Sequence, residues 1–281
     1  MSLDAHRHKK QLGQHFLSSP GVVEKIIRAI NPKPGEFIVE IGPGAGALSF
    51  PLLRAHGELT VIEFDRDLIE PLAIEGGKHG RLTIVHRDVL QVDFSKLGHG
   101  HDIEGPLRLV GNLPYNISTP ILFHVMEHAE AVRDMHFMLQ KEVVDRMAAE
   151  PGSKVYGRLS VMLQAVCHVT PLFDVPPGAF TPPPKVDSAV VRLVPRPPGE
   201  LGIRDAAHFA RVVAAAFSQR RKTLRNALSA LCEAEAIRAA GIDPGARAEQ
   251  VPVQGFVTLA NQLAESSARA PDARADDNAS P

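Results

Sequence analysis

The stretch "FIVEIGPGAG", residues 37–46, is an apolar run that ends in three glycines. Its β-branched and aromatic residues predict a buried strand, and the glycines allow the chain to turn tightly behind it. In parallel α/β sheets such a turn leads into a helix whose first N–H groups face a ligand. This stretch therefore predicts one strand of an α/β sheet, with a ligand site at its carboxyl end.

Strands and helices alternate on both sides of this stretch. The sequence pattern predicts strands over 59–65, 82–88, 107–112 and 135–140, and helices over 20–30, 47–56, 66–74, 119–129 and 141–150. Such alternation is typical of an α/β fold with a doubly wound, mostly parallel, Rossmann-like sheet. The predicted strands are apolar on both faces, as strands covered by helices on each side should be.

The pattern changes at Arg158. We expect antiparallel closing strands within 157–176 and 178–195, joined by a proline-rich loop. A proline- and glycine-rich linker, 195–202, then leads into an alanine-rich helical stretch. We therefore expect a main domain over 1–198 that includes an N-terminal basic segment (1–19), a small C-terminal helical domain over 199–264, and a disordered tail over 265–281.

The composition is that of a soluble globular protein, with 44% hydrophobic and 22% charged residues and a net charge of −1. Cys167 and Cys232 are the only cysteines and form no C-x-x-C pair, which predicts a reducing, cytoplasmic location without a disulfide framework or cysteine-held metal. No apolar run approaches the ~20 residues of a membrane helix, and the first residues lack a signal-peptide core. We therefore expect no membrane association.

Several predicted strands end in residues that suit a cofactor. The glycines Gly42 and Gly44 belong to a G-x-G-x-x-A pattern, which by itself leaves NAD, S-adenosylmethionine and a plain tight turn open. Glu63 ends the second strand, where a carboxylate can accept hydrogen bonds from ribose hydroxyls. Asp88 ends the third, where it can accept one from an adenine amino group. Together these strand ends favour a cofactor that contains adenosine.

The tetrapeptide Asn112-Leu113-Pro114-Tyr115 ends the fourth strand at the same edge. An exocyclic amine of a base has its lone pair delocalised into the ring, and an amide oxygen and a backbone carbonyl can each accept one of its N–H bonds. Proline fixes that carbonyl, and a tyrosine ring can stack on the base and stabilise the positive charge that develops. Such a base must be unpaired or flipped out of its helix.

By itself this tetrapeptide is more typical of an ordinary strand-to-helix turn, with Tyr115 as a packing residue. Its place in line with Gly42, Glu63 and Asp88 favours methyl transfer to a base. A nicotinamide oxidoreductase does not need this turn, and no hydride-transfer site is evident in the sequence.

Eight segments in sequence order extend these motifs over nearly the whole chain: "GQHFL", "VEIGPGAG", "VIEFDRDL", "GNLPYNISTPILFH", "MLQKEVVDRM", "YGRLSVMLQ", "PPGAFTPPPKVDSAVVRL" and "FSQRRKTLRNAL". In their order and density they resemble the KsgA-type small-subunit ribosomal RNA adenine dimethyltransferases. The resemblance implies transfer of methyl groups from S-adenosylmethionine, with S-adenosylhomocysteine as product. It also implies N6,N6-dimethylation of two adjacent adenosines in 16S rRNA, with the small ribosomal subunit as the partner of a monomeric enzyme.

The resemblance also implies roles for individual residues. Phe180 would face the target base from the side opposite Tyr115. The cofactor contacts would be His15, Leu17, Gly42, Gly44, Glu63, Asp88 and Asn112, and the target amine would be held by Asn112, Leu113 (through its carbonyl), Pro114 and Tyr115.

A cluster of basic residues, Arg220, Arg221, Lys222 and Arg225, lies on a predicted helix. A solvated helix face is the usual explanation of such a run. Here we interpret it as an RNA phosphate contact, because the expected substrate is RNA. "HVMEH", residues 124–128, matches a zinc-protease pattern, but no further acidic ligand follows it and we expect no metal.

Two alternative functions are compatible with the same motifs. A large-subunit rRNA methyltransferase of the antibiotic-resistance type shares the core motifs, although "YGRLSVMLQ" and "RRKTLRNAL" favour the small-subunit enzyme. A nonenzymatic RNA-binding or assembly factor of the same fold is disfavoured by the intact glycine loop and tetrapeptide.

Overall fold

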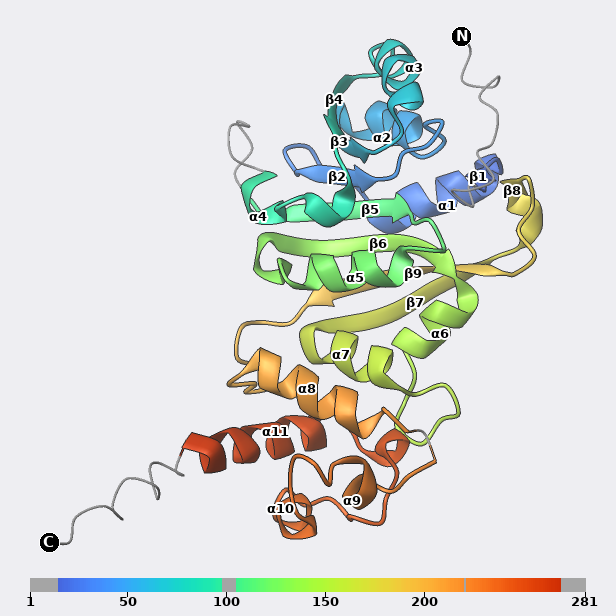
Figure 1. Ribbon diagram of the computed structural model, residues 1–281. Coiled ribbons are helices and arrows are strands. Elements are labelled where there is room, and N and C mark those ends of the chain that lie inside the picture. The colour runs from blue at the N-terminus through green and yellow to red at the C-terminus, as the bar shows by residue number, and fades with distance from the viewer. Residues whose placement is uncertain (1–14, 98–104, 220, 269–281) are drawn as a thin grey trace, which may run out of the picture. The chain divides into compact units, whose positions relative to one another are not determined.

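A computed structural model describes residues 15–97, 105–219 and 221–268 of the chain. Its main feature is a seven-stranded sheet in the order β4-β3-β2-β5-β6-β9-β7 (Figure 1). The strands are β2 (Ile38–Ile41), β3 (Glu58–Glu63), β4 (Arg81–His86), β5 (Leu107–Asn112), β6 (Val132–Gln140), β7 (Cys167–Val175) and β9 (Ser188–Pro195).

Five neighbouring strands, β4 to β6 in the sheet order, pair in parallel, and β9 and β7 then add in antiparallel fashion. The predicted doubly wound, mostly parallel sheet is therefore confirmed. The connecting helices are α1 (Pro20–Ile30), α2 (Ser49–His56), α3 (Arg66–Gly76), α4 (Phe94–Leu97), α5 (Ser118–Met126) and α6 (Lys141–Met147), with single 3₁₀ turns at Val89–Gln91, Ala129–Ala131 and Pro177–Ala179.

The sheet is covered on both faces (Figure 1). Helix α1 begins at Pro20, which suits a first helical position, and ends at Asn31 in the left-handed conformation. Its Ile26 and Ile30 pack with residues of α2 and of strands β2, β3, β5 and β6 in one apolar cluster. Helix α5 runs alongside β6 in Figure 1 and buries Ile121, Leu122 and Val125. Two covered faces explain why the strands carry nearly unbroken apolar runs.

A second, two-stranded sheet joins distant parts of the chain. Strand β1 (Phe16–Leu17) pairs antiparallel with β8 (Phe180–Thr181). The N–H of Ser18 donates to the carbonyl of Ala179 at 2.8 Å and extends this pairing. The N-terminal segment is thereby held against the loop between β7 and β9.

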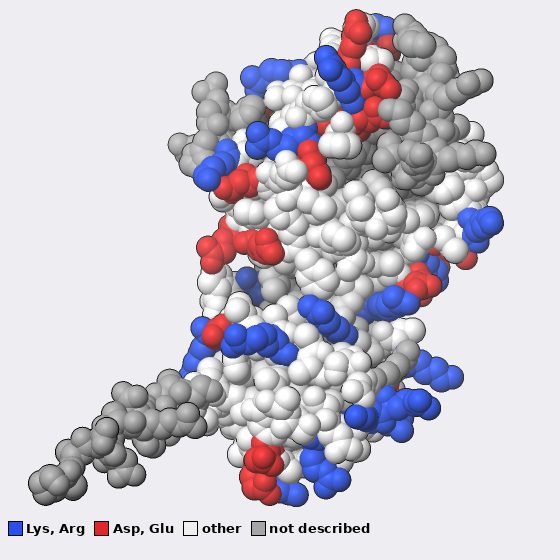
Figure 2. All heavy atoms as spheres, in the orientation of Figure 1, with Lys and Arg blue, Asp and Glu red and all other residues white. Residues whose placement is uncertain are grey.

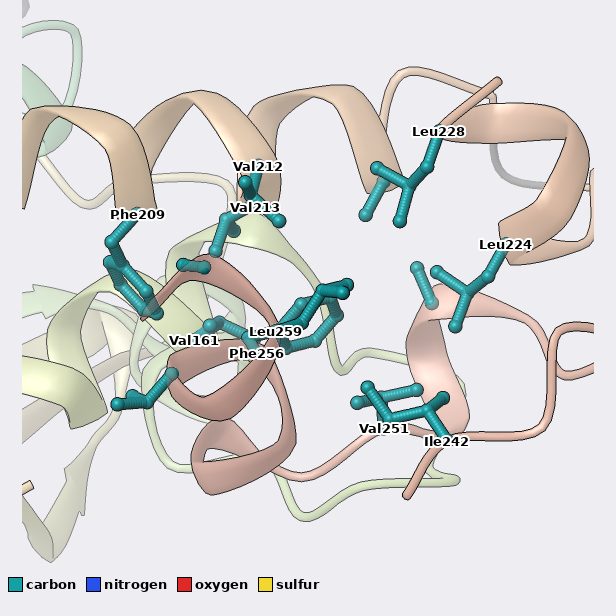
Figure 3. Packing of buried hydrophobic residues seen from close by; sticks show 14 of the residues in the cluster. Val161, Phe209, Val212, Val213, Leu224, Leu228, Ile242, Val251, Phe256 and Leu259 are labelled. Atoms are coloured by element: carbon teal, nitrogen blue, oxygen red, sulfur yellow. The ribbon is translucent and has the colours of Figure 1, made fainter. Parts of the chain in front are cut away.

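The chain folds into two compact units. The first contains the described residues up to Ala148 together with Val166–Arg196, and the second contains Ala149–Ala165 and the described residues from Pro197 onward. The second unit contains most of α7 (Arg158–Val166), and α8 (Ala206–Ala216), α9 (Leu224–Ala227), α10 (Ala234–Ala239), a 3₁₀ turn (Ala248–Gln250) and α11 (Val253–Ala268). Figure 3 shows its core, where Phe209, Val213 and Phe256 meet residues from α7 and α9.

The segment Arg158–Val166 was expected as a strand but forms helix α7, so the closing strands start only at Cys167. The Ser160 hydroxyl accepts the N–H of Gly157 at 3.0 Å and stabilises the first turn. Val161 and Ala165 are one helical turn apart and both lie in the core of the second unit. For this reason residues 149–165 fold with the C-terminal helices, whereas the sequence analysis placed them in the domain over 1–198.

Two further expectations need correction. Arg221 and Lys222 lie in a turn, not on a helix, because α9 begins only at Leu224. Helix α11 continues through Ala268, so residues 265–268 are helical although the tail was expected to begin at 265. Glu265, in this last turn, forms an ion pair with Arg204. None of the helices among the described residues is long and apolar enough to cross a lipid bilayer.

Candidate active site

A pocket opens at the carboxyl ends of β2, β3 and β5. Its empty volume is about 740 Å³, a figure that includes the open, solvent-filled mouth. The described residues that line it are His15, Phe16, Leu17, Glu40, Gly42, Pro43, Gly44, Ala47, Leu48, Glu63, Asn112, Leu113, Pro114 and Tyr115. The structure thus brings the glycine loop, the end of β3, the tetrapeptide after β5 and the N-terminal segment into one site.

The glycine loop is shaped by three left-handed residues. Gly42, Gly44 and Gly46 have φ of +67°, +54° and +85°, values that side chains with a Cβ rarely adopt. A Cβ on Gly44 would lie 3.0 Å from the Phe16 ring. The loop backbone therefore packs closely against Phe16 of the N-terminal segment, and both line the pocket.

Two carboxyls lie in the pocket, and the described lining residues include no lysine or arginine. Burial raises the pKa of Glu40 to about 8, and the neighbouring Glu63 carboxylate adds to this effect while the Ser49 hydroxyl opposes it. Burial also raises the pKa of Glu63, although backbone N–H groups of Asp65, Gly44 and Phe64 oppose the shift. Oε2 of Glu40 has no hydrogen-bond partner among the described residues. Such a site attracts a ligand that carries positive charge and N–H or O–H donors.

The tetrapeptide after β5 is held by backbone and side-chain bonds. The N–H of Leu113 donates to the carbonyl of Met138 on β6 at 3.1 Å, which keeps the turn in line with the sheet. Nδ2 of Asn112 donates to the carbonyl of His15 at 3.2 Å. Because the amide nitrogen is bonded there, its oxygen is the atom available to accept a ligand N–H.

The ring of Tyr115 stacks on the imidazole of His15, with centroids 5.8 Å apart and an interplanar angle of 30°. The imidazole Nδ1 lies 2.9 Å from the carbonyl of Pro182, to which it donates. His15 thus connects Tyr115 and Asn112 with the segment that follows β8.

Two residues assigned to the site by sequence do not line the pocket. Asp88 lies just past β4, and its carboxylate accepts the N–H of Leu90 at 3.0 Å. Phe180 is only 3% exposed and packs in the apolar cluster with Leu17. Arg220 and the N-terminal segment before His15 lie outside the described residues.

The two lining carboxyls bear on which of the cofactors left open by the glycine loop this pocket suits. S-adenosylmethionine carries a sulfonium and an ammonium group, so its charge complements the two carboxyls. The residues present fit S-adenosylmethionine, and the unpartnered Glu40 oxygen is an acceptor for such a ligand.

The family model described as "Ribosomal RNA adenine dimethylase" matches residues 5–265. The chain belongs to this family. Its relatives include "Ribosomal RNA small subunit methyltransferase A" of Xanthomonas campestris pv. campestris strain B100. The two sequences are 66% identical over a region that covers 90% of this chain and 95% of the relative. The protein of the same name from Xanthomonas oryzae pv. oryzae strain PXO99A is 65% identical over the same shares.

Solved structures show that the dimethylase chain shares its fold with distant relatives. A dimethyladenosine transferase from Plasmodium falciparum has a TM-score of 0.76 at 24% identity, covering 90% of this chain and 98% of that one. The 23S rRNA methyltransferase ErmE has a TM-score of 0.67 at 23% identity, covering 89% and 99%. The two likenesses support the Rossmann-like methyltransferase fold.

Glu40 and Phe16 line the pocket but were not predicted from the sequence. A signal existed for Glu40, because it is the one charged residue in an otherwise apolar strand. Phe16 had no such signal, since its place depends on the pairing of β1 with β8.

The "HVMEH" histidines have local partners. Nε2 of His124 lies 2.8 Å from the carbonyl of Val92, and His128 faces Asp93 at 3.6 Å. Among the residues that the structure describes, no group of three or more His, Cys, Asp or Glu is placed to hold a metal ion.

Proposed function

We propose that this protein transfers methyl groups from S-adenosylmethionine to the N6 amino groups of two adjacent adenosines in 16S rRNA, giving N6,N6-dimethyladenosine in the small ribosomal subunit. The observation that carries the proposal is the turn Asn112–Tyr115, which shares one pocket with the glycine loop and two carboxyls. Family membership and relatives named for the small ribosomal subunit favour this RNA over the large-subunit alternative. We further propose that the protein acts as a cytoplasmic monomer.

Each half of the pocket has a task in this proposal. S-adenosylmethionine, when bound, supplies a methyl group that the amine nitrogen takes, leaving S-adenosylhomocysteine. Glu63 accepts hydrogen bonds from the ribose hydroxyls, and the loop at Gly42 and Gly44 gives close backbone approach. Glu40 accepts from the cationic part of the cofactor, because its Oε2 lacks another partner.

The target amine is held by the turn after β5. The amide oxygen of Asn112 and the carbonyl of Leu113 accept its two N–H bonds, which turns the nitrogen lone pair out of conjugation with the ring. Pro114 restricts the backbone that carries the Leu113 carbonyl. The ring of Tyr115 stacks on the base and stabilises the positive charge that develops on nitrogen. The proton then leaves to water, so no strong base is required.

Three roles assigned from the sequence stay predictions. Asp88 is predicted to accept from the adenine of the cofactor, and Phe180 to stack on the target base. Arg221, Lys222 and Arg225, together with Arg220, are predicted to contact RNA phosphates; the first three are exposed on the second unit. Figure 2 shows lysine and arginine side chains over α8 and α9 of that unit.

The test is radiolabelled methyl transfer to small ribosomal subunits that lack the dimethyladenosines, with the product nucleoside identified. We expect label in N6,N6-dimethyladenosine of 16S rRNA. Tight subunit binding without label would favour the assembly-factor alternative, and label in large-subunit RNA would favour the resistance-type methyltransferase.

Replacing Asn112 by Ala is expected to lower the methylation rate about 100-fold or more, since a preorganised acceptor for the reacting amine is lost. Denaturant unfolding serves as the control for a folded protein, because Asn112 is itself a predicted cofactor contact. A variant that binds the cofactor and keeps full methylation would refute the role given to Asn112.

A further inference from the structure

The Tyr115 side chain is held by a hydrogen bond outside the pocket. Its hydroxyl lies 2.6 Å from Oγ of Ser188, slightly shorter than the usual distance between two hydroxyl oxygens. Ser188 is fully buried and is not among the described residues that line the pocket. The contact therefore acts on Tyr115 from the interior of the protein and leaves the ring faces free of it.

Ser188 is itself in a rigid position. It opens strand β9, where it pairs with Gln140 of β6 on one side and Val175 of β7 on the other. His15, the other partner of the Tyr115 ring, precedes a strand of only two residues. Of the two contacts, the bond to Ser188 is the one anchored in the main sheet.

A hydroxyl bond at the far end of a phenol restricts both side-chain torsions of a tyrosine. The ring of Tyr115 then keeps one orientation relative to the Leu113 carbonyl and the Asn112 amide. Stacking on a base requires the ring plane to match the plane of the base that these two acceptors hold. The orientation of the ring is thus part of the geometry that the reaction needs.

We propose that Ser188 is a positioning residue for methyl transfer, because its hydroxyl holds the Tyr115 ring in the orientation that stacks on the target adenine. This inference rests on the proposed function of Tyr115. Ser188 acts through Tyr115 and does not touch the cofactor or the base.

The chain offers a clean spectroscopic test, since it has two tyrosines and no tryptophan. The second, Tyr156, lies in the second unit, where its hydroxyl donates to the carbonyl of Val251. The difference in near-ultraviolet circular dichroism between the protein and Tyr115→Phe isolates the Tyr115 signal. We expect Ser188→Ala to remove most of that signal and Ser160→Ala, which also deletes the hydroxyl of a fully buried serine, to leave it unchanged.

In the methylation assay we expect Ser188→Ala to lower kcat/KM for the small subunit about fivefold, the effect of one hydrogen bond. The affinity for S-adenosylmethionine should stay within twofold of the unaltered protein. Tyr115→Phe loses the same bond, so the double variant Ser188→Ala/Tyr115→Phe should be no slower than Tyr115→Phe alone.

The outcomes separate the two proposals. Full methylation by Tyr115→Ala would refute the function proposed for Tyr115. A slow Tyr115→Ala together with a fully active Ser188→Ala would overturn the role of Ser188 and leave that of Tyr115 intact. If the losses in kcat/KM of Ser188→Ala and Tyr115→Phe added up in the double variant, the role of Ser188 would also be overturned, because Ser188 would then act through some other group.

Discussion

Glu40 lies within strand β2 between Val39 and Ile41, where an ionised carboxyl loses its hydration. Because burial raises the pKa of Glu40 to about 8, the ligand-free protein at neutral pH holds this group mostly protonated. A cation bound next to it would favour the charged form. Cofactor binding is therefore expected to release a proton from the site around neutral pH.

Replacing Glu40 by Gln is expected to stabilise the ligand-free protein more as the pH rises. The pKa is higher in the folded state than its ordinary value of 4.5, so the stability contributed by the protonated form is complete below pH 4.5 and is lost as the pH rises toward 8. The gap in unfolding free energy between the two proteins should grow by a few kcal/mol from pH 5 to pH 8, measured by denaturant unfolding. The same gap at both pH values would contradict a raised pKa.

The same variant is expected to bind S-adenosylmethionine about tenfold more weakly, since a neutral amide replaces a charge-assisted acceptor. Calorimetry in two buffers of different ionisation enthalpy would count the protons released on binding. Unaltered affinity and proton release would place the cation elsewhere in the pocket.

At the level of elements, the spacing between β5 and β2 depends on a glycine. A Cβ on Gly111 would lie 2.5 Å from the carbonyl oxygen of Ile41, closer than real contacts allow. Gly111 immediately precedes Asn112, so a displaced strand would also move the turn Asn112–Tyr115. The clash would be with backbone atoms of the neighbouring strand, so no side-chain rotation could relieve it.

Gly111→Ala is accordingly expected to destabilise the fold by about 1–3 kcal/mol, the range of overpacked interiors. Gly21→Ala is the matched control, because a Cβ there meets nothing within 4 Å and α1 gains a better helix former. Denaturant unfolding of both variants checks this, and equal stabilities would contradict the steric argument.

Sequence patterns predicted those elements whose residues carry local information. Buried strands such as Ile38–Ile41 are marked by apolar runs, and Gly42 and Glu63 were placed correctly at the strand ends. Helix α7 was missed because its apolar residues lie on more than one face. Without a single apolar stripe, such a segment resembles a buried strand in the sequence. The charged run near Arg221 was assigned to a helix on composition, although no apolar periodicity supported it.

Residue patterns predicted the candidate site only where strand ends define it, whereas His15 and Leu17, which also line the pocket, were named from the family resemblance. Asn112 and Tyr115 follow β5 directly, so their place follows from the topology of the sheet. The contacts of His15 and Phe16 depend on a partner segment about 165 residues away, and no local pattern carries that information. Ser188 was missed for the same reason, as its partner lies 73 residues away.

At the scale of the whole molecule, the net charge of −1 gives RNA no general attraction, so affinity must come from local clusters. We expect the triple variant Arg221→Ala/Lys222→Ala/Arg225→Ala to weaken binding to the small subunit and to reduce the salt slope by up to about one phosphate contact per charge. Filter binding over a series of salt concentrations measures both.

Arg238→Ala is the control for this variant. Arg238 is an exposed arginine of the same unit, but it forms an ion pair with Glu235 at 2.8 Å on helix α10. Its loss should leave the salt slope unchanged. Equal slopes for the triple variant and the unaltered protein would make the basic cluster a solvated surface.

The pairing of β1 with β8 has a consequence for biosynthesis. Phe16 leaves the translating ribosome early, while its partner Thr181 appears only after most of the chain has been made. Until then the glycine loop lacks the segment that covers it, and His15 has no carbonyl of Pro182 to bind. The parallel core can begin to fold during translation, but the complete pocket cannot. A nascent chain released before residue 182 would therefore carry the turn Asn112–Tyr115 without the segment that completes the pocket.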